Sequence, residues 1–142
     1  MIIPDVNVLV HAYNRQSLQH DAVRAWWEDT LSHSRPVGLP WISILGFIRI
    51  CTNPRIALHP MTAAEAAGHV KSWLAAPHVD LLHPGDRHAE IFFGLLENLG
   101  LAANLTTDVH LAALAIEYQA ELASTDSDFT RFKGLRWINP AG

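Results

Sequence analysis

Four aspartates could act together in this chain. Asp5 follows the apolar segment "MIIP", Asp126 and Asp128 follow "ELAS", and Asp108 begins the apolar stretch that leads into that second segment. Carboxylates about 5 Å apart repel one another by roughly 3 kcal/mol at an effective dielectric near 20, so a gathered set needs a cation, a shared proton or distance. Mg²⁺ and Mn²⁺ select carboxylate oxygens and water, whereas thiolate sites for zinc or copper need more cysteine than the single Cys51. If the aspartates meet, a Mg²⁺ or Mn²⁺ site is the chemistry they favour.

Each of these positions also has a purely local explanation. Aspartate is a favoured N-cap residue, and Asp5, Asp108 and Asp126 each precede a possible helical turn. Residue types and spacing alone therefore leave two interpretations open, a shared metal site and a set of separate caps.

The elements that must position these residues follow from the hydrophobic pattern. Five short apolar segments are expected to form strands: residues 1–4, 36–40, 79–82, 121–124 and 135–138. Four segments between them have helical features: residues 20–33, 61–76, 86–100 and 108–119. The helix within 61–76 is expected to start at a capping box made by Thr62 and Glu65.

Alternating strands and helices predict a three-layer α/β/α sandwich with a mostly parallel five-stranded sheet. In such sheets ligands bind beyond the carboxyl ends of the strands. Asp5, Asp126 and Asp128 follow strands, and a helix that leads into a parallel strand begins at the same edge, which is where Asp108 lies. The predicted fold thus allows all four carboxylates to meet.

Composition sets further limits. The chain has 142 residues, of which 49% are hydrophobic and 17% charged, as expected for one globular domain over residues 1–142. Neither a signal-like start nor a membrane-spanning apolar run is present, so we expect a cytoplasmic protein without membrane association. The formal net charge of −4 means that any nucleic-acid binding would depend on local arginines.

Three segments carry a resemblance to a known family. "MIIPDVNVLVHAYN", "TTDVHLAALAIEYQAELASTDSDFTRF" and "LRWINP" together resemble PIN-domain ribonucleases, specifically the VapC-type toxins of toxin–antitoxin modules. The resemblance implies an endoribonuclease that depends on Mg²⁺ or Mn²⁺, acts on RNA, forms a homodimer and is held inactive by a cognate VapB-type antitoxin. It also implies that Asp5, Asp108 and Asp126 are catalytic metal ligands and that Asp128 is a further catalytic acid.

Six other residues are candidates around such a site. The possible lining residues are Asn7, Ser43, Ser124 and Thr125, while Arg49 and Arg55 could contact RNA phosphates. An exposed arginine is, however, more often only solvated surface.

One departure from the family pattern concerns Gly46, which lies where the family usually has a glutamate. Close helix packing is one explanation, and a site with one carboxylate fewer is the other. A catalytically weakened PIN-like domain that binds RNA or protein is therefore the alternative function. A phosphoacceptor receiver domain, which also gathers acids at strand ends, would need a lysine after the last strand, and "LRWINPAG" has none.

Overall fold

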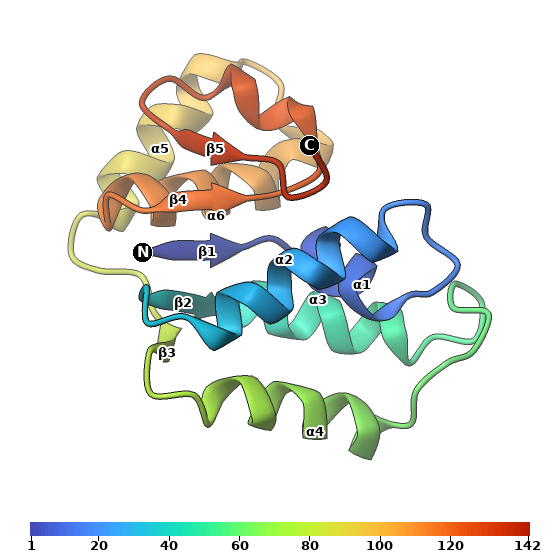
Figure 1. Ribbon diagram of the computed structural model, residues 1–142. Helices are drawn as coiled ribbons and strands as arrows, with labels where there is room; N and C mark the ends of the chain where they lie inside the picture. The colour runs from blue at the N-terminus through green and yellow to red at the C-terminus, as the bar shows by residue number, and fades with distance from the viewer.

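The computed structural model describes residues 1–142 and contains one five-stranded sheet. The strands are β1 Ile2–Pro4, β2 Val37–Pro40, β3 Val79–Leu82, β4 Glu121–Ala123 and β5 Arg136–Ile138. Their order in the sheet is β3-β2-β1-β4-β5, and every neighbouring pair is parallel. All five predicted strand segments are confirmed, and the sheet is parallel throughout (Figure 1).

Six α-helices connect these strands. They are α1 Val6–Tyr13, α2 His20–Ser32, α3 Trp41–Cys51, α4 Ala63–Leu74, α5 His88–Leu99 and α6 Thr106–Glu117, with short 3-10 turns at η1 Ala103–Leu105 and η2 Ser127–Arg131. The predicted capping box is present, because Thr62 and Glu65 bond reciprocally at the start of α4. None of the helices combines the length and the apolar character needed to cross a membrane.

Two hydrophobic cores lie on opposite faces of the sheet. Ile2 belongs to the core built with helices α1 to α4, and the next residue, Ile3, belongs to the core built with α6. Successive strand residues point to opposite faces, so this switch marks the two sides of the central layer. The three-layer α/β/α sandwich is therefore confirmed, with α2 in front of the sheet and α5 and α6 behind it in Figure 1.

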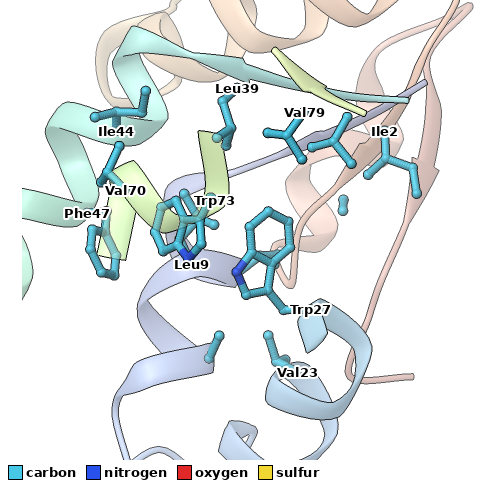
Figure 2. Packing of buried hydrophobic residues seen from close by; sticks show 14 of the residues in the cluster. Ile2, Leu9, Val23, Trp27, Leu39, Ile44, Phe47, Val70, Trp73 and Val79 are labelled. Atoms are coloured by element: carbon cyan, nitrogen blue, oxygen red, sulfur yellow. The ribbon is translucent and has the colours of Figure 1, made fainter. Parts of the chain in front are cut away.

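The larger core is built around aromatic side chains. Trp27 of α2 and Trp73 of α4 meet edge to face with ring centroids 5.5 Å apart, and Phe47 of α3 lies 4.9 Å from Trp73. Leu9 of α1 lies beside them in Figure 2, so one cluster fastens four helices to the same face of the sheet. This packing holds the starts of α1 and α3, which both border the candidate site.

Candidate active site

Strand register brings the first acidic residue to the end of β4. Pro4 pairs with Ala123, and the next amide, that of Asp5, donates to the carbonyl of Ala123 over 2.9 Å. The strands β1 and β4 therefore end side by side, although about 120 residues of chain separate them. The residues that follow the two strands must meet at the carboxyl edge of the sheet.

Asp5 is held by a complete set of donors. Its Oδ1 accepts from the backbone N–H of Val6 over 2.7 Å, which caps α1, and its Oδ2 accepts from Ser124 Oγ over 2.8 Å and from Asn7 Nδ2 over 3.2 Å. Only 7% of Asp5 is exposed. Burial raises the pKa of its carboxyl group, the hydrogen bonds from Ser124 and Val6 oppose this rise, and the nearby charge of Asp126 adds to it.

Ser124 and Asn7 connect the two loops that carry the acids. The hydroxyl oxygen of Ser124 accepts from the backbone N–H of Asp126 over 3.0 Å and also from Asn7 Nδ2 over 3.0 Å. Asn7 Oδ1 accepts from the backbone N–H of Thr125 over 3.1 Å. These bonds fix the loop after β4 against the first turn of α1, so the positions of Asp5 and Asp126 depend on each other.

Asp128 lies in the turn η2, and Asp126 is the N-cap residue before it. Asp126 Oδ1 accepts from the backbone N–H of Asp128 over 2.9 Å and so caps this turn. Asp128 is exposed and forms an ion pair with Arg131, whose Nη2 lies 3.2 Å from its Oδ1. Asp5 and Asp126 thus act as caps and also lie at the same edge of the sheet. At these two positions a capping role and a place in a shared acidic site are both compatible with the structure.

Asp108 differs from the other two expected caps. The helix α6 begins at Thr106 with Leu105 at the N-cap, so the expected start at Asp108 was two residues late. Asp108 lies within the first turn and its carboxylate takes part in none of the hydrogen bonds of the structure. Asp108 is therefore not an N-cap, and no capping bond to a nearby backbone group holds its carboxylate.

Electrostatics show that the four carboxylates lie near one another. The pKa of Asp108 rises from 3.8 to about 6, first because the group is partly buried and then because of the charges on Asp5, Asp126 and Asp128. Arg131 opposes this rise. The predicted fold placed these four acids at one edge of the sheet, although they are distant in the sequence. Mutual repulsion among them agrees with that prediction.

A cavity of about 390 Å³ opens beside these acids. It is lined by Asp5 and by residues of α1, α3 and α6: Val6, Ile42, Leu45, Gly46, Arg49, Thr107, Asp108 and Leu111. Arg49 therefore reaches the site. Arg55 lies in the loop beyond the far end of α3 and does not line the cavity.

Two predicted lining residues have different surroundings. The backbone of Thr125 is tied to Asn7, as described above. Ser43 is fully buried and its hydroxyl donates to the carbonyl of Pro4 over 2.7 Å, so it supports the strand end before Asp5 and does not face the cavity.

Gly46 is explained by close packing of helices. A Cβ atom at this position would lie 2.5 and 2.8 Å from the two methyl carbons of Val6. Val6 is the first residue of α1 and directly follows Asp5. A larger side chain, including a glutamate, would have to displace the start of α1, so the site has no carboxylate at this position.

The donor chemistry fits a hard divalent cation. All candidate ligands supply oxygen, and the raised pKa of Asp108 records a repulsion that a bound cation would relieve. No three His, Cys, Asp or Glu side chains stand close enough to enclose an ion in the present arrangement of the side chains. Binding would therefore require the carboxylates to come closer together, chiefly by a turn of Asp108, because hydrogen bonds already hold Asp5 and Asp126.

Two polar contributors to the site were missed by the sequence analysis. Thr107 lines the cavity, and Arg131 both pairs with Asp128 and lowers the pKa of Asp108. The spacing of Asp128 and Arg131, three residues apart in "SDFTR", was the available signal for the second.

A parallel sheet with helices on both faces, and four interacting carboxylates beyond its strand ends, defines an α/β protein with an acidic centre. The family model described as "PIN domain" matches residues 2–135. The chain belongs to the PIN-domain family. This confirms the resemblance found in the sequence and removes the receiver-domain alternative.

Individual relatives cover almost the whole chain. This chain is 47% identical over 140 residues to Ribonuclease VapC33 of Mycobacterium tuberculosis, and the match covers 99% of this chain and 98% of that protein. It is 42% identical to Ribonuclease VapC37 of the same organism, covering 99% and 97% of the two chains. The solved structure of VapBC-1 from nontypeable Haemophilus influenzae is similar in fold, with a TM-score of 0.71 at 15% identity over 100% of both chains.

Proposed function

We propose that this protein is a metal-dependent endoribonuclease and the toxin of a toxin–antitoxin module. The observation that carries the proposal is the acidic edge, where Asp108 has a pKa raised to about 6 by burial and by three neighbouring carboxylates. The similarity to proteins named ribonucleases supports RNA as the substrate. The proposed cofactor is Mg²⁺, or Mn²⁺ in its place.

Asp5, Asp108 and Asp126 are the proposed ligands. When bound, the divalent cation supplies positive charge to the phosphodiester and activates water for attack. Asp5 presents a carboxylate whose orientation is fixed by Ser124, Asn7 and the start of α1. Asp126 is fixed in the same way by its cap of η2, so two of the three ligands are held before a cation arrives.

Asp128 and Arg131 complete this picture at the exposed side of the site. The ion pair with Arg131 restrains Asp128 beside the other acids, where it can orient water. Arg49 lines the cavity and carries a positive charge next to the negative centre, so it is the proposed contact for an RNA phosphate. Arg55 lies outside the cavity, and we assign it no phosphate contact.

The proposed partners are a cognate VapB-type antitoxin and a second copy of the chain. The structural neighbours include VapBC complexes, such as that from Rickettsia felis bound to a promoter DNA fragment. The helix α5 contains no buried residue, although it carries Ile91, Phe92, Phe93, Leu95, Leu96 and Leu99. Four of them, Phe92, Leu95, Leu96 and Leu99, pack against the smaller core, whereas Phe93 is 56% exposed. This exposed aromatic residue supports self-association, and the proposed location of the protein is the cytoplasm.

The test is RNA cleavage by protein purified free of its partner. The wild type should cut structured RNAs in Mg²⁺ or Mn²⁺ and lose this activity in EDTA or on Asp5→Ala. Asp21→Asn, which changes an exposed aspartate in the first turn of α2, is the matched control and should cut like the wild type. If the wild type never cuts above the level of Asp5→Ala, the protein is instead a PIN-like binding module, which Gly46 in place of a carboxylate would favour.

A further inference from the structure

The indole N–H of Trp27 is a buried donor that the fold leaves unpaired. Only 1% of Trp27 is exposed, and its Nε1 atom has no hydrogen-bond partner in the protein. Its neighbour Trp73, which packs against it edge to face (Figure 2), donates instead to the hydroxyl of Tyr13 over 2.8 Å. A buried N–H group without an acceptor costs free energy, so almost all such groups in folded proteins are paired. The acceptor for Trp27 must come from outside the chain.

A cavity of about 290 Å³ lies beside Trp27, where α1, α2 and α4 meet. The arginine and acidic residues in its wall are Arg15, Arg24 and Glu28. Arg24 and Glu28 pair with each other over 2.8 Å, whereas Arg15 takes part in none of the ion pairs of the structure. This cavity, which we call the donor cavity, therefore has an unpaired positive charge as well as an unpaired N–H group.

Tyr13 supplies a second donor to the donor cavity. Its hydroxyl oxygen accepts from Trp73, so the hydroxyl hydrogen is free to donate. Burial raises the pKa of Tyr13, and the phenol therefore keeps this hydrogen at neutral pH. Trp27 Nε1 lies close enough to the hydroxyl to oppose that rise, although the two groups form no hydrogen bond. The two donors thus lie near each other.

A second cavity, of about 370 Å³, adjoins the donor cavity. The two share Tyr13, Arg15 and Met61 in their walls. Most of the residues that line the second cavity are hydrophobic, and none is acidic. Ile56 and Leu58, in the loop after α3, belong to its wall and are 57% and 68% exposed. We call it the apolar cavity.

A molecule that fills both cavities needs an acceptor group with one negative charge and an apolar part. A carboxylate meets the first requirement, because its two oxygens can accept from a guanidinium group and from N–H and O–H donors at once. A phosphate monoester carries nearly two negative charges, which a single unpaired arginine would leave partly uncompensated. The two cavities together have the volume usual for a small-molecule site.

We propose that the donor cavity and the apolar cavity form one binding site for a small organic acid with an apolar chain or ring. The carboxylate binds Trp27, Tyr13 and Arg15. The apolar part covers Ile56 and Leu58. None of the four aspartates of the candidate active site lines either cavity, so this inference does not rest on the proposed nuclease function.

Octanoate is the probe, because it joins a carboxylate to a straight apolar chain. Titration of the full-length protein is followed by NMR of the indole N–H groups, to which the five tryptophans contribute one signal each. The signal of Trp27, identified by its loss in Trp27→Phe, should shift and saturate. Octanoate should also raise the melting temperature, since it binds only the folded protein. From butanoate to octanoate, binding should strengthen by up to about fourfold for each buried methylene group.

Calorimetric titration of three variants tests the assigned contacts. Arg15→Gln, at an exposed position, should weaken octanoate binding by roughly tenfold to a hundredfold, the range for a hydrogen bond to a charged group. Trp27→Phe keeps an aromatic ring in the core and should weaken binding by about threefold to tenfold. Arg55→Gln is the matched control, because Arg55 also has no ion pair but lines neither cavity, and it should bind like the wild type.

Three results would overturn the proposal. If millimolar octanoate moves no indole signal and leaves the melting temperature unchanged, the donor cavity takes only water. If octanol binds as tightly as octanoate, the carboxylate contact is wrong. If Arg15→Gln melts at the wild-type temperature and binds octanoate unchanged, the head-group assignment is wrong. RNA cleavage is not measured in any of these experiments, so each result leaves the nuclease proposal as it stands.

Discussion

Replacing Asp108 with asparagine should stabilise the protein when no divalent cation is present. The carboxylate of Asp108 is partly buried near three other acids, which raises its pKa from 3.8 to about 6. The difference of about two corresponds to roughly 3 kcal/mol at 1.36 kcal/mol for each pKa unit. Solvent screening of this half-exposed group reduces the expected effect to about 1–2 kcal/mol. For a domain of this size that gain raises the melting temperature by about 3 to 8 °C.

The sign depends on pH. The folded protein binds a proton on Asp108 more tightly than the unfolded chain does, so its stabilising protonation is fully present below about pH 4 and is lost as pH rises through about 6. The stability of the wild type should therefore fall across this window relative to Asp108→Asn. The difference between the two proteins should be small at pH 4 and largest at pH 8.

The assay is thermal unfolding in EDTA at several pH values from 4 to 8, followed by circular dichroism. Asp21→Asn is the matched control, because Asp21 also lies in the first turn of a helix but is exposed. Adding Mg²⁺ or Mn²⁺ should stabilise the wild type more than Asp108→Asn, since a cation relieves the same repulsion. A mutant destabilised equally at every pH, with and without metal, would refute the reasoning and assign Asp108 a purely structural role.

Three further predictions concern the supports of the site and the fold. Gly46→Ala should destabilise the protein by about 1–3 kcal/mol in urea unfolding, because the added methyl group would overlap Val6; wild-type stability would show that α1 shifts freely. Ser124→Ala should lower the free energy of unfolding by about 1–3 kcal/mol and raise the pKa of Asp5 further. NMR titration of the Asp5 carboxyl carbon measures this pKa, and an unchanged value would contradict the role given to the Ser124 hydroxyl. Thr62→Ala should remove the capping box of α4 and lower stability by about 1 kcal/mol while RNA cleavage stays at the wild-type rate; a loss of cleavage would mean that α4 also affects the site.

Much of the fold could be predicted from local pattern. The five apolar segments all became strands, and the capping box at Thr62 and Glu65 marked the start of α4 correctly. These features depend on side chains within a few residues of one another, so they are present in the sequence before any tertiary contact forms.

The errors came from positions where distant residues decide the outcome. The start of α6 was placed at Asp108 because aspartate favours N-caps, yet the helix begins at Thr106. Ser43 was expected to face the site, but it bonds to Pro4 on a strand nearly forty residues earlier. Arg55 follows α3 closely in sequence, but the helix carries it away from the cavity that Arg49 lines.

The sequence by itself determined the alternating elements and therefore the parallel sheet, and that was enough to bring Asp5, Asp108, Asp126 and Asp128 to one edge. Only the tertiary structure decided how strongly they interact. The raised pKa of Asp108 depends on burial and on charges contributed by other elements, while the bond from Ser124 to Asp5 depends on the register of β1 against β4. Electrostatic repulsion and hydrogen bonding vary steeply with distance in space, and distances between remote residues exist only once the chain has folded.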